Sequence, residues 1–223
     1  MKTYGPPHRK EATNIAALDA KPKISQLFKD VDCYKFCRKF QGYHDQVVEA
    51  FAKSFDGTKW HVGLMQLHVD MQRIARVTWI PLEGENWFKS TSTKKIDYKQ
   101  FLTYNHQDVV FHKDIPRSYL QDESQQLLKF IQIYITCKGR YGRTFIYHFR
   151  LLMHFKGIKP MNMPFFLLKR LTKMSNKVQK NSNASSTRVF HRGLIKLLIL
   201  YKLQRVGKKW DYLLFWGYFK TKK

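Results

Sequence analysis

The chain has 223 residues, 43% of them hydrophobic and 15% aromatic, and a formal net charge of +25. This apolar content excludes a disordered chain, and the length fits one domain, with or without a loosely attached second half. A charge of this size opposes compaction through self-repulsion, so we expect an anionic partner.

The first segment, residues 1–23, contains three prolines among scattered charges. This composition predicts a disordered leader outside the core, with at most a short helix near residues 12–19. In residues 24–40 apolar side chains recur at helical spacing. Cys33 and Cys37 lie one turn apart in this helix, and we expect both to pack as small hydrophobic residues.

The clearest helix is predicted for Asp45–Phe55, which its first residue caps and Gly57 ends. Apolar and polar residues then alternate around residues 59–69, which predicts a short β-hairpin. Asp70 follows at a position suited to cap a short helix that ends before Pro81.

Residues 83–119 are rich in Gly, Ser, Thr, Asn and charge, and predict a long irregular connection. Apolar periodicity resumes after it and predicts four further helical segments. These segments are Gln125–Thr136, Thr144–Phe155, Phe165–Val178 and Arg188–Val206.

The predicted fold class is therefore mainly α, an irregular helical domain with a small β-hairpin near residues 59–69. Residues 24–210 would form this domain, between the leader at 1–23 and a basic tail at 211–223. The three cysteines make an odd count without a framework, so we expect free thiols and a reducing compartment. An apolar signal core and a transmembrane segment are both missing from the pattern, which favours the nucleus or the cytoplasm over secretion.

The positive charge is concentrated in the second half of the chain. Residues 1–120 carry 19 Lys and Arg against 13 Asp and Glu, a net of +6, whereas residues 121–223 carry 22 against three, a net of +19. No Asp or Glu occurs between Ser124 and Trp210. Solvated surfaces normally mix both signs, so this distribution favours a polyanion-binding half over a merely solvated one.

Two groups of basic residues are candidate nucleic-acid contacts, because Lys and Arg neutralise phosphates and Tyr stacks on unpaired bases. The first group follows the helix at 125–136 and comprises Lys138, Arg140, Tyr141 and Arg143. The second runs from the last predicted helix toward the tail and comprises Arg188, Arg192, Lys196, Lys202, Arg205, Lys208 and Lys209. A basic loop that ends a helix, or a solvated helix face, would explain the same residues without a ligand.

Several segments carry a family resemblance through their order and spacing. They are the helix with Phe51 and Phe55, the turn Trp60-His61-Val62-Gly63, the segment Ile74–Pro81 and the apolar helices after Gln125. In this order they resemble the plant transposon protein domain, a family spread through plant genomes beside retroelement genes. The resemblance covers about residues 31–207, and segments 147–155 and 161–166 also look like open reading frames of plant repetitive elements. It implies an association with transposable elements and with the nucleus, and it supplies no active site.

One position departs from the family pattern. Trp79 stands where the family usually has a glycine that ends the short helix. A helix stop of that kind uses the left-handed backbone region, where a bulky residue costs on the order of 1 kcal/mol or more. The departure suggests a copy under little constraint, or a helix that ends in another way.

The sequence contains no motif typical of catalysis, such as a Gly-rich phosphate loop or a nucleophile elbow. A transposase or integrase requires two or three carboxylates around divalent ions. All carboxylates except Asp211 lie within the first 123 residues, and two of them are predicted helix caps. Cys33 and Cys37 with His44 and His61 are spaced unlike a zinc site. We therefore expect no catalytic residues, metal, cofactor or small-molecule substrate.

The sequence thus predicts a non-catalytic protein that binds DNA or RNA without sequence specificity through its C-terminal half. One alternative is a capsid-like retroelement protein, a homo-oligomer that packages RNA and still assembles in high salt. Others are the remnant of a catalytic transposase and a decayed reading frame.

Overall fold

The computed structural model describes residues 15–39, 45–62, 65–87, 96–110, 114–137, 142–180 and 192–205. The α-helices are α1 (Ile15–Asp19), α2 (Pro22–Asp30), α3 (Cys33–Arg38), α4 (Asp45–Ser54), α5 (Met71–Thr78), α6 (Asp122–Ile131), α7 (Ile146–Phe155), α8 (Met163–Lys180) and α9 (Arg192–Arg205). The strands are β1 (Lys59–Val62), β2 (Met65–His68), β3 (Asp114–Pro116) and β4 (Arg143–Phe145). Short 3-10 turns η3 (Lys99–Phe101), η4 (Tyr104–His106) and η5 (Arg117–Tyr119) and the π-helix η6 (Gln132–Thr136) complete the described elements.

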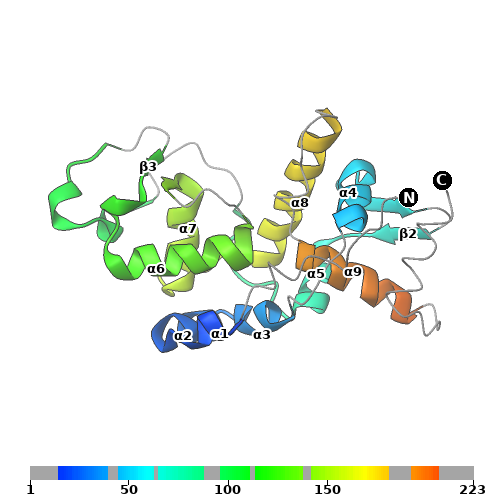
Figure 1. Cartoon of the computed structure of the whole chain (residues 1–223), viewed down its shortest axis with the longest axis horizontal. Helices are drawn as coiled ribbons and strands as arrows, with labels where there is room; N and C mark the ends of the chain where they lie inside the picture. The colour runs from blue at the N-terminus through cyan, green and yellow to red at the C-terminus, as the bar shows by residue number, and fades with distance from the viewer. Residues whose placement is uncertain are drawn as a thin grey trace, which may run out of the picture.

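Helix α8 stands in the middle of the molecule (Figure 1). On one side of it lie α4, the β1–β2 hairpin, α5 and α9, and on the other side lie α6, α7 and β3. The first-half helices α4 and α5 pack against the second-half helices α8 and α9, while α2 packs against α7. The two halves of the sequence are therefore interleaved in one fold.

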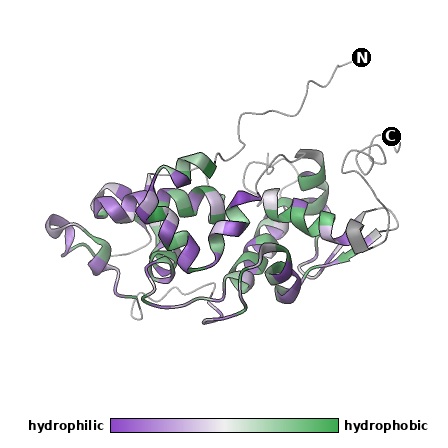
Figure 2. Cartoon of the chain, turned by 90° about the horizontal axis from the view of Figure 1, so that it is seen from below, coloured by the Kyte–Doolittle hydropathy of each residue, from purple (hydrophilic) through white to green (hydrophobic). Residues whose placement is uncertain are grey.

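Aromatic rings join the layers of the core. The ring of Phe28 in α2 lies 4.6 Å from that of Phe155 in α7 and 6.2 Å from that of Tyr134 in η6. The ring of Phe51 in α4 lies 5.3 Å from that of Trp60 in β1. All five side chains are buried, and Figure 2 shows hydrophobic and hydrophilic residues within single helices, so that these helices have an apolar face to bury.

The predicted fold class is confirmed, because the described residues are mainly helical with a small hairpin. Trp60 pairs with Leu67 across that antiparallel hairpin. The predicted helix at 45–55 is α4. The helix predicted at 125–136 is α6 continued by η6, and α6 begins three residues earlier than predicted, at Asp122. The carboxylate of Asp70 caps α5 by accepting the backbone N–H of Arg73 at 2.6 Å.

The short helix expected near residues 12–19 is present as α1, but residues 15–23 do not lie outside the core as predicted. Helix α1 and the start of α2 occupy this range, and Leu18 is completely buried. The hydroxyl of Tyr34 donates to Asp19 at 2.6 Å, which ties α1 to α3. Leu18, with the partly buried Ile15, thus anchors this short helix to the core. Residues 1–14 and the predicted tail at 211–223 lie outside the described residues.

The predicted helix at 24–40 is interrupted. Helix α2 ends at Asp30, and α3 begins at Cys33 after Asp32 adopts φ 55°, in the left-handed region. Asp tolerates this region better than most residues do, so the break is locally permitted. Cys33 and Cys37 are buried as expected, and all three cysteines of the chain are free thiols.

A second two-stranded sheet was not predicted. Strand β3 lies within the segment expected to be irregular, and it pairs antiparallel with β4, so that Ile115 is opposite Thr144. Leu102 and Leu120 form a further isolated bridge and are both fully buried. The connection is therefore pinned to the core at several points, although most of its described residues remain irregular.

A tight contact fixes the start of α8. Gly84 has φ +92°, and a Cβ built there would lie 2.7 Å from backbone atoms of Met161. Only glycine fits both the backbone conformation and this approach. Next to it, the N–H of Glu85 donates to the Pro160 carbonyl at 3.2 Å, and the N–H of Asn162 donates to the Glu85 carbonyl at 3.0 Å.

Trp79 ends α5 in the left-handed region, with φ 62°. Its N–H donates to the carbonyl of Ala75 at 2.7 Å, as in the helix stop that a glycine usually provides. The helix therefore does not end in another way: Trp79 adopts the left-handed stop for which the family usually has a glycine.

Candidate nucleic-acid interface

Helix α8 carries the candidate interface, and its first turn shows why it begins where it does. The side-chain oxygen of Asn162 accepts the backbone N–H of Phe165 at 3.0 Å, which is N-cap geometry. Pro164 follows within the first turn, where its missing N–H costs nothing. Asn162 and Pro164 therefore fix this end of α8.

One face of α8 packs on α4. The hydroxyl of Ser175 donates to the Phe55 carbonyl at 2.8 Å, and the side-chain amide of Gln179 donates to the same carbonyl at 3.0 Å. Leu171 and Val178 are buried on this side. These residues recur at intervals of three and four, so they define a single inward face.

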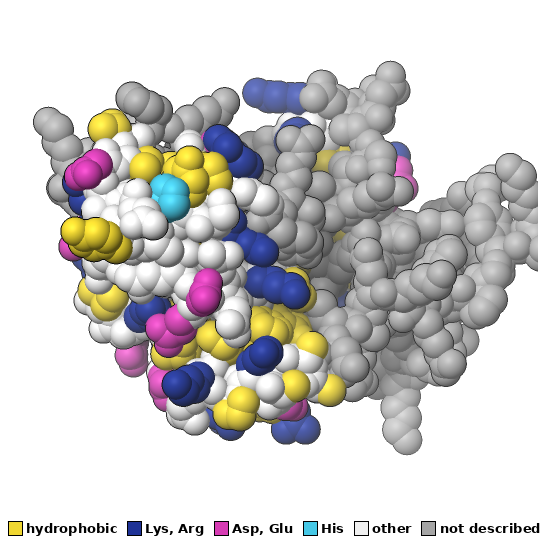
Figure 3. Space-filling model, turned by 60° about the vertical axis from the view of Figure 1, so that its left-hand side comes forward, with side chains coloured by type: hydrophobic (Ala, Val, Ile, Leu, Met, Phe, Trp, Pro, Cys, Tyr) yellow, Lys and Arg dark blue, Asp and Glu magenta, His cyan; other side chains and the backbone are white. Residues whose placement is uncertain are grey.

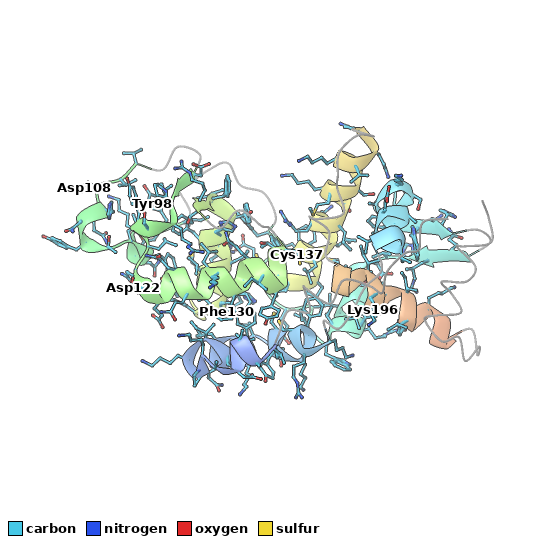
Figure 4. The ribbon with its side chains drawn as sticks, in the orientation of Figure 1. Tyr98, Asp108, Asp122, Phe130, Cys137 and Lys196 are labelled. Atoms are coloured by element: carbon cyan, nitrogen blue, oxygen red, sulfur yellow. The ribbon has the colours of Figure 1, made fainter. Side chains whose placement is uncertain are left out.

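The opposite face of α8 carries a row of lysines. Lys169, Lys173, Lys177 and Lys180 are all exposed. We call these four residues the lysine row. At 3.6 residues per turn they fall within about 80° of one another and roughly opposite Ser175. Over eleven residues the row extends about 16 Å along the helix axis. Figure 4 shows nitrogen-tipped side chains reaching from α8 on the side away from α4.

The charges of the lysine row are not balanced within the helix, since α8 contains no Asp or Glu. Among the residues that the structure describes, Lys177 and Lys180 have no acidic partner. The ammonium group of Lys169 lies 5.4 Å from the ring centroid of Phe165, an aromatic contact that leaves its charge intact. Four like charges on one face create a local positive potential that attracts anions.

The end of the molecule formed by α6, α7 and their neighbours has a different surface. Figure 3 shows acidic and basic side chains interspersed there. Lys156 pairs with Glu123 at 3.1 Å, and Lys159 pairs with Glu85 at 3.2 Å. A solvated surface normally mixes charges of both signs, as this end does. The lysine row differs because it carries positive charges alone.

Helix α8 is also attached to the segment from which the first predicted basic group departs. The guanidinium of Arg170 donates to the carbonyl of Thr136 at 2.8 Å and lies 5.7 Å from the ring of Tyr147. Burial lowers the pKa of Arg170, and Tyr147 and Cys137 act in the opposite direction. Lys169 is therefore the sequence neighbour of Arg170, which contacts the end of η6. Residues 138–141 follow η6 closely in the sequence.

The predicted site residues have different fates. Arg143 lies in β4 and forms an ion pair with Asp114, to which its Nε donates at 2.8 Å. Its charge is therefore neutralised within the protein. The lysine side chains at 196 and 202 are half-buried on α9, which packs on α5 and α4. Figure 4 shows Lys196 on α9, and burial lowers its pKa. Lys196 is therefore not fully exposed, and its contact with phosphate stays a prediction.

The side chains of the remaining predicted residues are not described. Arg192 and Arg205 lie within α9. The others lie outside the described residues, and they are Lys138, Arg140, Tyr141, Arg188, Lys208 and Lys209.

Sequence reasoning missed the lysine row, although its signal was present. The helix at 165–178 was predicted, and lysines at 169, 173, 177 and 180 recur with the helical period. Reading that period for charge as well as for apolar residues would have found them.

Within the described ranges, no three His, Cys, Asp or Glu side chains come together as a metal site. No described helix is long and apolar enough to cross a membrane. No family model, curated protein or solved structure matches the chain. The resemblance to the plant transposon protein domain thus remains a prediction from the quoted segments.

Proposed function

We propose that this protein binds nucleic acid without sequence preference, through phosphate contacts made by the lysine row. The observation that carries the proposal is the exposed face of α8, on which four lysines recur in a helix that contains no carboxylate. Each ammonium group that neutralises a phosphate releases condensed counterions, and this entropy gain drives non-specific binding.

Lysine suits this role better than a role in reading bases. Its ammonium group is a flexible point charge, whereas base recognition in the major groove uses planar, bidentate groups such as that of Arg. Phosphate contacts position a protein on the nucleic acid and carry no sequence information. The basic residues at 138–141, which follow Cys137 in the sequence, remain candidate phosphate contacts.

We also propose an origin in a plant transposable element and a location in the nucleus. The resemblance in sequence order supports this, and its segments fall in chain order on α4 with Phe51, on β1 with Trp60 and on α5 before Pro81. A basic protein that binds nucleic acid is suited to that compartment.

The proposal is tested with two variants of equal charge. In the first, all four lysines of the row are replaced by Gln. In the control, four exposed lysines from α2, β1, η3 and α6 are replaced instead, namely Lys23, Lys59, Lys99 and Lys129. Binding to a random 20-base-pair duplex is measured by fluorescence anisotropy at 100 mM salt.

We expect the lysine-row variant to bind the duplex roughly 10²- to 10³-fold more weakly than the wild type, because it loses about four phosphate contacts. The control variant should remain much closer to the wild type, since its lost charges are scattered. Equal affinities of the wild type and the lysine-row variant would mean that the row is only a solvated face.

A further inference from the structure

Trp79 is a large aromatic residue that the fold leaves exposed. Its side chain is 53% exposed at the end of α5. Its backbone occupies the left-handed region, with φ 62°, where L residues with bulky side chains are disfavoured and glycine is favoured. Because more than half of the side chain faces solvent, apolar burial offsets little of this strain.

A cation lies against one face of the indole. The ammonium group of Lys39, directly after α3, is 2.9 Å from the centroid of the Trp79 ring. Burial lowers the pKa of Lys39, in keeping with its position against the ring. The cation and the backbone stop together hold the indole in one orientation on the surface.

Further cationic and aromatic groups lie beside this position. Arg76 precedes Trp79 by three residues, about one helical turn, so the two side chains leave α5 on neighbouring sides. Its guanidinium donates to the hydroxyl of Tyr201 in α9 at 2.6 Å. The guanidinium of Arg73 lies 5.9 Å from the ring of Tyr201. Helix α5 and its neighbours therefore combine exposed aromatic and positively charged groups.

We propose that Trp79 is a stacking platform for an unpaired base of single-stranded nucleic acid, with Lys39 and Arg76 contacting the adjacent phosphates. This inference rests on the proposed function and adds a preference for single strands. Aromatic side chains stack on any unpaired base, whereas the bases of a duplex are already stacked on one another. An exposed indole at a position that favours glycine, flanked by cations, has the composition of such a platform.

The test separates stacking from phosphate binding. Trp79→Gly and Trp79→Phe are compared with the full-length wild type on four probes of equal length: oligo(dT), oligo(U), an abasic DNA strand and a duplex. The abasic strand retains the phosphates but lacks bases. The Tm of each variant is measured in parallel, since glycine suits the left-handed backbone and its variant should be at least as stable as the wild type.

We expect Trp79→Gly to bind oligo(dT) and oligo(U) roughly 5- to 150-fold more weakly, the range for loss of one stacking aromatic. Its affinities for the abasic strand and the duplex should not change. Trp79→Phe should retain most of the oligo(dT) affinity. A loss confined to oligo(dT) or to oligo(U) would restrict the platform to DNA or to RNA.

Unchanged oligo(dT) and oligo(U) affinity in Trp79→Gly overturns the proposal, and a lowered Tm in that variant would then assign Trp79 a purely structural role. Equal losses of affinity on all four probes overturn it as well, because a loss that does not require unpaired bases does not come from stacking. The lysine-row variant serves as the reference for the proposed function. If it and the wild type bind the abasic strand equally, phosphate binding by the row fails, whatever the result at Trp79.

Discussion

Arg150 is the most deeply buried charge of the described residues. Its side chain is 2% exposed, and its guanidinium pairs with Glu85, which also accepts Lys159 at 3.2 Å. A buried cation without a counter-charge is costly. The half-exposed carboxylate of Glu85 supplies that counter-charge to Arg150. Because Glu85 also bridges to Met161, this ion pair joins α7 to the start of α8.

Replacing Glu85 with Gln should therefore destabilise the protein, by about 1 to 3 kcal/mol. The measurement is the free energy of unfolding in urea at pH 7. Glu83→Gln, at an exposed position two residues earlier, removes the same charge and should change stability by less than about 0.5 kcal/mol. Equal changes in the free energy of unfolding for the two substitutions would show that the carboxylate of Glu85 does not stabilise the buried Arg150.

His154 is a buried imidazole held in its neutral form. Its Nδ1 accepts the N–H of Met161 at 3.1 Å, and burial, assisted by the charge of Arg150, lowers its pKa from 6.5 to about 4. At pH 7 the residue is mostly neutral in both the folded and the unfolded state. Below pH 6.5 the unfolded state gains a proton that the folded state does not accept until about pH 4.

Stability should consequently fall as the pH drops from 6.5 to about 4, with a slope from His154 approaching 1.4 kcal/mol per pH unit, an order-of-magnitude value. Urea unfolding at pH 7, 6, 5 and 4.5 measures this slope. His154→Gln should flatten it, whereas His61→Gln, at an exposed position in β1, should leave it unchanged. An unchanged slope in His154→Gln would contradict a neutral buried imidazole.

At the scale of single elements, α8 has two tasks on opposite faces. Leu171, Ser175 and Val178 pack it against its neighbours, and the lysine row faces outward. The helix must therefore be well anchored for the lysines to keep their spacing. Its N-terminus depends on Asn162, whose side chain caps the first turn and whose amide also donates to the Leu82 carbonyl at 3.3 Å.

Asn162→Ala should cost about 1 to 2 kcal/mol of stability, because it removes the N-cap acceptor. Asn162→Asp keeps that acceptor and is the matched control, with a smaller loss expected. Thermal unfolding followed by circular dichroism compares the three proteins. Equal losses for Ala and Asp would indicate that the donor to Leu82, and not the cap, matters at this position.

The sequence predicted those elements whose signals are local. Helix α4, the hairpin and the cap at Asp70 each follow from residues within about ten positions of one another. The β3–β4 sheet lacks such a signal, because its strands have three residues each and lie 26 residues apart. Only the tertiary fold selects that pairing, since short strands have too few residues to show a period.

The same distinction applies to the candidate site. The positive half of the chain was visible in the composition, but composition does not say which cations have partners within the protein. Arg143 pairs with Asp114, which lies 29 positions earlier, and the packing of α9 half-buries Lys196. The lysine row was readable as a helical period, whereas its exposure depended on which face α4 covers.

For the whole molecule, the interleaved fold decides where the charges of the two sequence halves lie in space. Helices from both halves surround α8, so the acidic residues of the first half are not segregated from the basic second half (Figure 1). Pairs such as Arg143–Asp114 and Lys159–Glu85 join the two halves of the sequence, and the four exposed lysines of the row lie on the outer face of α8.

The salt dependence of duplex binding tests this account most directly. The logarithm of the binding constant is measured against the logarithm of the salt concentration between 50 and 200 mM, for the wild type, the lysine-row variant and the control with four scattered substitutions. Each phosphate contact contributes about 0.9 to the slope, so loss of the row should reduce its magnitude by about 3.6. The control should retain nearly the wild-type slope. Equal slopes for the wild type and the lysine-row variant would contradict phosphate binding by α8.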